Sequence, residues 1–234
     1  MNHFITLADL TDFNQTLDLA MDLKKNPYKL NNIGKGKTLG LLFFNPSLRT
    51  RLSTQKAAQN LGLNTMVMNF SQESWALEFE DGTKMSGRRS EHVREAAAVV
   101  SHYCEMVATR AFASLSDKEK DEAEIVLRSF TKYASVPIIN MESATAHPLQ
   151  ALADAITLNE FKKTHKPKVV LTWAPHPKAL PHAVGNSFVK MMGNLDADFI
   201  IAHPEGYALN PDITRGVKCF TDQEEAFKNA DFIY

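Results

Sequence analysis

Residues 45–51, Asn-Pro-Ser-Leu-Arg-Thr-Arg, combine side chains that suit a phosphate group. They follow an apolar run at 39–44 that predicts a buried parallel strand, and Ser47 stands where a helix would begin. Unpaired backbone N–H groups at the helix start, two hydroxyls and the guanidinium groups of Arg49 and Arg51 would then converge on one anion. The alternative is that Ser47 only caps the helix and that both arginines lie in solvent.

Polar residues also follow three other predicted strands, namely Arg110, the segment 142–150 and the segment 175–178. In a doubly wound fold the carboxyl ends of parallel strands meet, so these groups are expected to share one site. Three arginines at a helix start suit an oxyanion with about two negative charges. His147 and Gln150 can address a carbonyl oxygen and an amide hydrogen beside that anion. The pattern therefore indicates a pocket for an acyl phosphate.

Other kinds of site fit the sequence less well. His147 and Asp154 have no third ligand at a suitable spacing, so no metal site is predicted. The Gly-Lys-Thr triplet at 36–38 precedes its strand and lacks the earlier glycine of a nucleotide-binding loop. Ser143, His147 and Asp154 lie in one short segment without a strand-turn-helix elbow, which argues against covalent catalysis.

Helical and strand patterns alternate along the chain and predict an α/β fold of two doubly wound parallel-sheet domains, at 1–147 and 148–234. The last apolar run, 232–234, stops inside a strand, so we expect a C-terminal part to be missing. The expected helices begin with one that runs from residue 7 to Pro27 and continue at 48–61, 91–103, 117–133, 148–163, 181–193 and 221–229. The expected strands lie at 39–44, 65–70, 106–109, 136–140, 168–173, 198–203 and 217–220.

The composition limits the class of protein. The 234 residues are 44% hydrophobic and 23% charged and carry a net charge of -1, as in a globular chain that can bury a core. This charge supplies no long-range field for nucleic acid or an anionic membrane, so neither is an expected partner. No run reaches membrane-spanning length, and nothing marks export. Cys104 and Cys219 are far apart, which gives no disulfide framework and suits a reducing cytoplasm.

Two segments resemble signature sequences of the aspartate and ornithine carbamoyltransferases. Residues 47–51, Ser-Leu-Arg-Thr-Arg, resemble the Ser-x-Arg-Thr-Arg phosphate loop of that family, and residues 147–154 resemble its His-Pro-x-Gln-x-x-x-Asp segment. The segments 43–47, 172–181 and 203–207 further resemble the branch of the family that acts on N-acylated ornithine. The similarity runs over the whole chain.

The resemblance implies transfer of a carbamoyl group from carbamoyl phosphate to the side-chain amine of an N-acylornithine, in arginine biosynthesis and without a cofactor. Of the site residues, Thr50, Arg110 and His147 would hold the carbonyl oxygen, on which negative charge grows during attack. The residues that would contact carbamoyl phosphate are Ser47, Leu48, Arg49, Thr50, Trp75, Arg110, His147, Pro148, Leu149 and Gln150.

The resemblance also assigns residues to the acceptor and implies an assembly. The loop 71–90 would carry Trp75 into the neighbouring subunit's site of a homotrimer. Ser90 stands where the succinyl-specific enzymes carry proline and the acetyl-specific ones glutamate. Because Ser90 lacks a charge that would repel a succinyl carboxylate, we expect a succinyl substrate. The residues that would face the N-acylornithine are Glu142, His176, Pro177, Lys178 and Ser90.

Several functions stay open at the level of sequence. They are an enzyme for N-succinylornithine or N-acetylornithine, a carbamoyltransferase for another amine, and a noncatalytic anion-binding fragment. The segment 174–177, Ala-Pro-His-Pro, favours the first. Without the resemblance, Glu142 is equally plausible as a solvated loop carboxylate.

Overall fold

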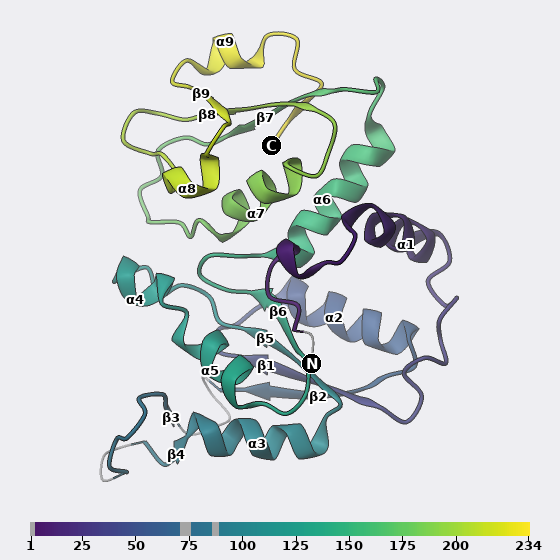
Figure 1. Cartoon of the computed structure of the whole chain (residues 1–234), viewed down its shortest axis with the longest axis vertical. Coiled ribbons are helices and arrows are strands. Elements are labelled where there is room, and N and C mark those ends of the chain that lie inside the picture. The colour runs from purple at the N-terminus through teal and green to yellow at the C-terminus, as the bar shows by residue number, and fades with distance from the viewer. Residues whose placement is uncertain (1–2, 71–75, 86–88) are drawn as a thin grey trace.

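The computed structural model describes residues 3–70, 76–85 and 89–234, which form two α/β units stacked along the long axis of the molecule (Figure 1). Each unit contains a four-stranded sheet, with the strand orders β2-β1-β5-β6 and β10-β7-β8-β9. All strand pairs of both sheets in the described part are parallel. The predicted fold of two doubly wound parallel sheets is confirmed.

The first unit has helices on both faces of its sheet. One core cluster lies between the sheet and α3 and α5, around Leu42 and Phe130, and a second lies on the other face around Leu41 and Ala58 of α2. Its strands are β1 (Thr38–Phe43), β2 (Asn64–Asn69), β5 (Met106–Arg110), β6 (Ile138–Glu142) and the short pair β3 (Leu77–Glu78) and β4 (Glu91–His92). Its helices are α2 (Leu48–Asn60), α3 (Val93–Tyr103), α4 (Lys118–Glu122) and α5 (Ile125–Tyr133).

The second unit repeats this arrangement with shorter elements. Its strands are β7 (Lys168–Thr172), β8 (Asp198–Ala202), β9 (Lys218–Phe220) and β10 (Phe232–Ile233). Its helices are α6 (Pro148–Phe161), α7 (Ala183–Met192), α8 (Pro211–Thr214) and α9 (Gln223–Phe227). Among the described residues, no helix has both the length and the apolar composition needed to cross a bilayer.

The N-terminal elements, η1 (Leu7–Asp9) and α1 (Phe13–Lys25), pack beside α6 (Figure 1). Phe13 and Leu17 share one buried cluster with Ala151 and Ala155 of α6 and with Phe188 of α7. The start of the chain therefore packs into the core of the second unit. This shared core holds α6, which follows directly from the first sheet, in a defined position relative to both sheets.

The prediction of one helix over 117–133 is wrong. The chain forms α4 and α5 instead, and Glu124 between them has a left-handed backbone with φ 47°. The Glu124 carboxylate accepts hydrogen bonds from the N–H and the hydroxyl of Thr145, at 2.9 and 2.8 Å. This contact ties the segment after β5 to the loop before α6. Here a tertiary interaction overrides the local helical pattern.

The helices predicted at 91–103 and from residue 7 also begin later than expected. Glu91 and His92 form β4, and the helix begins at Val93, because His92 caps it through Nδ1, which accepts the N–H of Arg94 at 3.1 Å. The opening helix is interrupted after η1 and restarts at Phe13. In both places a capping side chain decides where the helix begins.

Candidate functional site

Two predicted site segments leave neighbouring strands at the point where the strand order reverses. β2 lies on one side of β1, and β5 and β6 lie on the other. The register pairs Phe43 at the end of β1 with Arg110 at the end of β5. Ligands of open α/β sheets bind at such a switch point, outside the carboxyl ends of the strands. The structure thus brings the start of α2 and Arg110 together.

Arg110 lies buried against the turn that precedes α2. Its Nε and Nη2 donate to Oε2 of Glu142 at 3.0 and 2.8 Å, and its Nη1 donates to the carbonyl oxygen of Pro46 at 3.2 Å. Arg110 and Glu142 are each only 8% exposed, so the alternative of Glu142 as a solvated loop carboxylate is wrong. Because ions lose hydration on burial, such a pair contributes more to positioning than to stability.

Asn45 is a site residue whose role the sequence analysis missed. Its Oδ1 accepts the N–H of Phe112 at 2.7 Å, and its carbonyl oxygen accepts from Arg110 Nη1 at 3.4 Å. These bonds join the turn after β1 to the loop after β5. The available signal was an asparagine directly before a proline at the end of a strand, where its side chain can organise a turn.

The first turn of α2 presents backbone N–H groups and the hydroxyl of Ser47. Ser47 precedes the helix, and within the described residues its side chain makes no capping hydrogen bond. The N–H groups of Leu48, Arg49 and Thr50 have no intrahelical acceptor, because they belong to the first turn. Arg51 points elsewhere than expected: its Nη2 donates to Asn69 at 2.9 Å and its guanidinium covers the Phe43 ring.

His147 is an uncharged donor beside the buried pair. Its ring Nδ1 accepts the backbone N–H of Gln150 at 3.4 Å, and the backbone N–H of His147 donates to the hydroxyl of Ser187 at 2.8 Å. Burial lowers the pKa of His147, and this effect and the charge of Arg110 outweigh the opposing charge of Glu142. With Nδ1 as an acceptor, the hydrogen-bond pattern assigns the ring proton to Nε2. His147 can therefore donate one N–H to a ligand without carrying charge.

The lowered pKa of His147 predicts how stability depends on pH. The unfolded chain binds a proton near the ordinary value of 6.5, and the folded chain binds it only at lower pH. The contribution of this ring is therefore complete above pH 6.5 and is lost as the pH falls below it. We expect urea unfolding to show this loss in the wild type and a weaker one in His147→Asn. His102→Asn, on the exposed side of α3, is the matched control and should behave as the wild type.

Residues 148–150, the first turn of α6, are fixed by packing and by a hydrogen bond. Pro148 occupies the first helical position, where its missing N–H does no harm, and Leu149 packs on the cluster between the sheet and α2. Gln150 Nε2 donates to Asp154 Oδ1 at 2.8 Å. The structure therefore brings His147 and Gln150 to the same helix start, as predicted.

A cavity of about 360 Å³ lies between the two units, beside this helix start. The loops after β5, β6 and β7 line it, and Leu180, His182 and Asn186 form its wall on the side of the second unit. The sequence analysis missed these residues. His176, Pro177 and Lys178 lie just before them in an exposed turn, in which His176 Nδ1 lies 3.1 Å from the N–H of Lys178.

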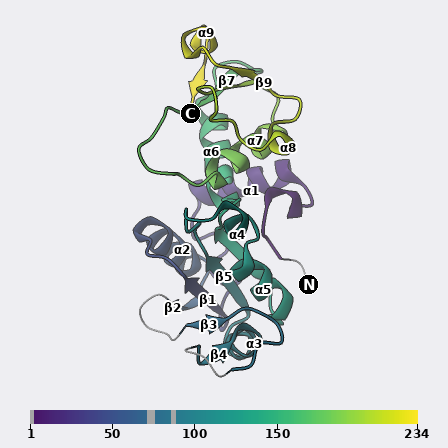
Figure 2. The same cartoon turned by 90° about the vertical axis from the view of Figure 1, so that its left-hand side faces the viewer.

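The structure does not bring Ser90 to the other predicted site residues of the same chain. It lines a separate hollow of about 640 Å³ with Asp81, His92 and Tyr133. Figures 1 and 2 both show β4, which directly follows Ser90, at the end of the first unit that is remote from α6. Trp75 lies outside the described residues.

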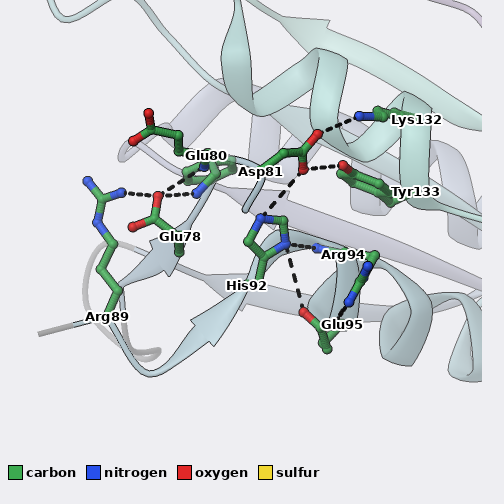
Figure 3. A network of polar contacts seen from close by, with 10 residues as sticks. Glu78, Glu80, Asp81, Arg89, His92, Arg94, Glu95, Lys132 and Tyr133 are labelled. Atoms are coloured by element: carbon green, nitrogen blue, oxygen red, sulfur yellow. Dashed lines mark hydrogen bonds and ion pairs between the residues drawn. The ribbon is translucent and has the colours of Figure 1, made fainter. Parts of the chain in front are cut away.

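A polar network fixes Asp81, which lies in the described segment 76–85 (Figure 3). The Asp81 carboxylate accepts hydrogen bonds from Lys132 Nζ at 2.7 Å and from the Tyr133 hydroxyl, and it lies 3.7 Å from His92 Nε2. The bond from Lys132 is the main cause that lowers the pKa of Asp81. These contacts fasten the segment to α5 and to the start of α3.

Comparisons with known proteins point to one family. Residues 2–160 match the family model described as "aspartate/ornithine carbamoyltransferase, carbamoyl-P binding domain". An N-succinylornithine carbamoyltransferase of Bacteroides thetaiotaomicron is 48% identical over 234 residues, which are 100% of this chain and 74% of the relative. An N-acetylornithine carbamoyltransferase of Xylella fastidiosa is 38% identical over 251 aligned residues, with coverage of 100% and 74%.

Solved structures are similar over both sheets. An N-acetyl-L-ornithine transcarbamylase with one glutamate replaced by serine, complexed with carbamyl phosphate and N-succinyl-L-norvaline, has a TM-score of 0.91 and 36% identity. The match covers 100% of this chain and 75% of that one. An acetylornithine transcarbamylase complexed with acetylcitrulline has a TM-score of 0.92 and 34% identity, with coverage of 100% and 74%.

Proposed function

The chain belongs to the aspartate/ornithine carbamoyltransferase family, and we propose that it transfers the carbamoyl group of carbamoyl phosphate to the side-chain amine of N-succinyl-L-ornithine. The products are N-succinyl-L-citrulline and phosphate, in arginine biosynthesis in the cytoplasm. The observation that carries the choice of acceptor is the identity of 48% to an N-succinylornithine carbamoyltransferase, against 38% to an N-acetylornithine carbamoyltransferase.

In the proposed site, the phosphate group of carbamoyl phosphate lies at the start of α2. The hydroxyl of Ser47, the N–H groups of Leu48 and Thr50 and the guanidinium of Arg49 bind its oxygens. A helix N-terminus with adjacent arginine suits a doubly charged anion because N–H groups and cation act together. Trp75 reaches the same ligand from a neighbouring subunit of a homotrimer. A bound phosphate with its charge neutralised is a good leaving group.

The carbamoyl group lies between α2 and the start of α6. The amine attacks the carbonyl carbon as the free base, so a C–N bond forms, the C–O bond to phosphate breaks, and phosphate leaves with the electron pair. The proton that the attacking nitrogen loses goes to the departing phosphate. Negative charge grows on the carbonyl oxygen, where the Thr50 hydroxyl, Arg110 and Nε2–H of His147 donate hydrogen bonds. Gln150 accepts from the carbamoyl NH2. The donor substrate is already activated, so the reaction needs no cofactor.

The acceptor occupies the cavity between the units, with the carbamoyl phosphate domain at 1–147 and the acceptor domain at 148–234. Glu142, which is paired with Arg110 at 2.8 Å, lies between the two substrates. His176, Pro177 and Lys178 close over the acceptor from the β7 loop. In the homotrimer, Ser90 faces the acyl group bound by a neighbouring subunit, which accounts for its distance from α6 of its own chain.

The proposal is tested by the choice of acceptor. We would measure turnover of the full-length protein with N-succinylornithine, N-acetylornithine and free ornithine, each with carbamoyl phosphate. We expect turnover with the succinylated amine, less with the acetylated one and none with free ornithine. Turnover of free ornithine alone would rule the proposal out. Phosphate binding without turnover of any amine would favour a noncatalytic protein.

Ser90→Glu is expected to shift the preference from the succinylated to the acetylated acceptor. A carboxylate near the succinyl carboxylate adds roughly 1.4 kcal/mol of repulsion, or about a tenfold change in the ratio of kcat/KM values. In support, a solved relative with glutamate replaced by serine holds N-succinyl-L-norvaline. Ser90→Gln adds similar volume without charge and should keep the succinyl preference. Equal kcat/KM ratios in the wild type, Ser90→Glu and Ser90→Gln would show that Ser90 does not face the acyl group.

A further inference from the structure

Asp154 lies one helical turn after Gln150 on α6, and the two side chains are joined by a hydrogen bond. Gln150 Nε2 donates to Asp154 Oδ1 over 2.8 Å. An amide carries its donors at one end only, and a carboxylate can only accept. The bond therefore determines that Nε2 faces Asp154 and that Oε1 is the end of the amide left for another partner.

Tyr234 approaches the same carboxyl group from the second sheet. Its backbone is paired with β7, through bonds of 2.9 Å to Val170 and Thr172, and its ring stacks on Phe188 at 4.2 Å. Its hydroxyl lies next to the Asp154 carboxyl group and lowers the pKa of that group. Burial and the neighbouring Asp154 raise the pKa of this phenol, so the hydroxyl stays a donor.

The Asp154 carboxyl group is in an unfavourable place for a charge. Burial raises its pKa, and the hydrogen bond from Gln150 and the neighbouring Tyr234 hydroxyl oppose that shift. Its Oδ2 is buried and has no partner in close hydrogen-bonding geometry within the described part of the chain. A buried carboxylate with few donors costs free energy of folding. Stability alone therefore does not account for an acidic side chain at this position.

We infer that Asp154, completed by Tyr234, is a positioning residue that orients the Gln150 amide so that Oε1 accepts an N–H of the carbamoyl group. The inference rests on the proposed function. With the amide reversed, its NH2 would face the NH2 of carbamoyl phosphate, and two donors would oppose each other. Tyr234 would thus connect the second sheet to the site that binds the first substrate.

The test compares two ligands that differ by the carbamoyl group. Carbamoyl phosphate and inorganic phosphate are titrated separately into the full-length protein by calorimetry, without any amine. The Asn side chain in Asp154→Asn can bind either end of the Gln150 amide, so it no longer fixes which end faces the ligand. We expect this variant to weaken binding of carbamoyl phosphate by about tenfold, the size of one lost hydrogen bond and one mismatched donor pair. Inorganic phosphate should bind as to the wild type, because it does not contact Gln150.

Double substitution tests whether Asp154 acts through Gln150. Gln150→Ala should cause a loss similar to that of Asp154→Asn, and the double variant should lose no more than Gln150→Ala alone. Tyr234→Phe should also weaken binding of carbamoyl phosphate relative to inorganic phosphate, but by a smaller factor than Asp154→Asn. Tyr103→Phe, which removes an exposed hydroxyl on α3, is the matched control and should bind both ligands as the wild type.

The outcomes separate this inference from the proposed function. A wild type that binds carbamoyl phosphate no better than phosphate would overturn the proposed function. If the wild type prefers carbamoyl phosphate to phosphate and Asp154→Asn keeps this preference, only the role of Asp154 is overturned. An equal loss of affinity for both ligands would also overturn this role of Asp154. The same holds if the two losses of affinity multiply in the double variant of Asp154→Asn and Gln150→Ala. If Asp154→Asn does not fold, Tyr234→Phe decides by the same comparison.

Discussion

Replacing Arg110 with leucine is expected to lower turnover by about 10²-fold or more, because it removes a preorganised donor to the oxygen on which negative charge develops. The substitution also leaves Glu142 buried without its partner, which costs about 3–5 kcal/mol of folding free energy. Steady-state kinetics and urea unfolding of the same samples measure the two effects. If turnover equals that of the wild type, Arg110 does not contact the reacting group.

A second substitution separates the two effects of Arg110→Leu. In the double variant Arg110→Leu with Glu142→Leu, no unpaired charge remains, and apolar side chains fill the space of the former pair. We expect most of the lost unfolding free energy to return, because an apolar replacement of a buried pair is often neutral. Turnover should stay low. Recovery of both stability and turnover would mean that Arg110 acts only through folding.

Replacing His147 with asparagine is expected to lower kcat by about 10²–10³-fold, the effect of losing one donor to a developing oxyanion. Asparagine can still accept the N–H of Gln150, because it is a good helix cap. Stability at neutral pH should therefore change little. Binding of inorganic phosphate should also be preserved, because the phosphate contacts α2. The measurement is kcat at saturating substrates together with phosphate affinity.

His147→Ala is the control for the capping role. It removes the ring donor and the cap together, so it should lower kcat by the same factor as His147→Asn. It should also lower the free energy of unfolding by about 1 kcal/mol. If His147→Asn turned over within a few-fold of the wild type while His147→Ala did not, the ring would serve as a cap and not as a donor to substrate.

Much of the fold could be predicted from the sequence because it depends on local periodicity and on capping. The strand at 39–44, the helix from Leu48 and the helix from Pro148 follow from apolar spacing and from the residues at their ends. The break at Glu124 could not be predicted, because it is stabilised by Thr145, which lies 21 residues away. No local pattern records such a bond.

The sequence by itself determined which chemical groups the protein has at the ends of its strands, and therefore the class of ligand that they suit. The tertiary structure alone decided how these groups act. Arg110 is paired with Glu142, and His147 is held neutral with its donor on Nε2. It also placed β4, which directly follows Ser90, apart from α6. These properties arise from burial and from contacts between residues distant in sequence, where no periodicity relates one partner to the other.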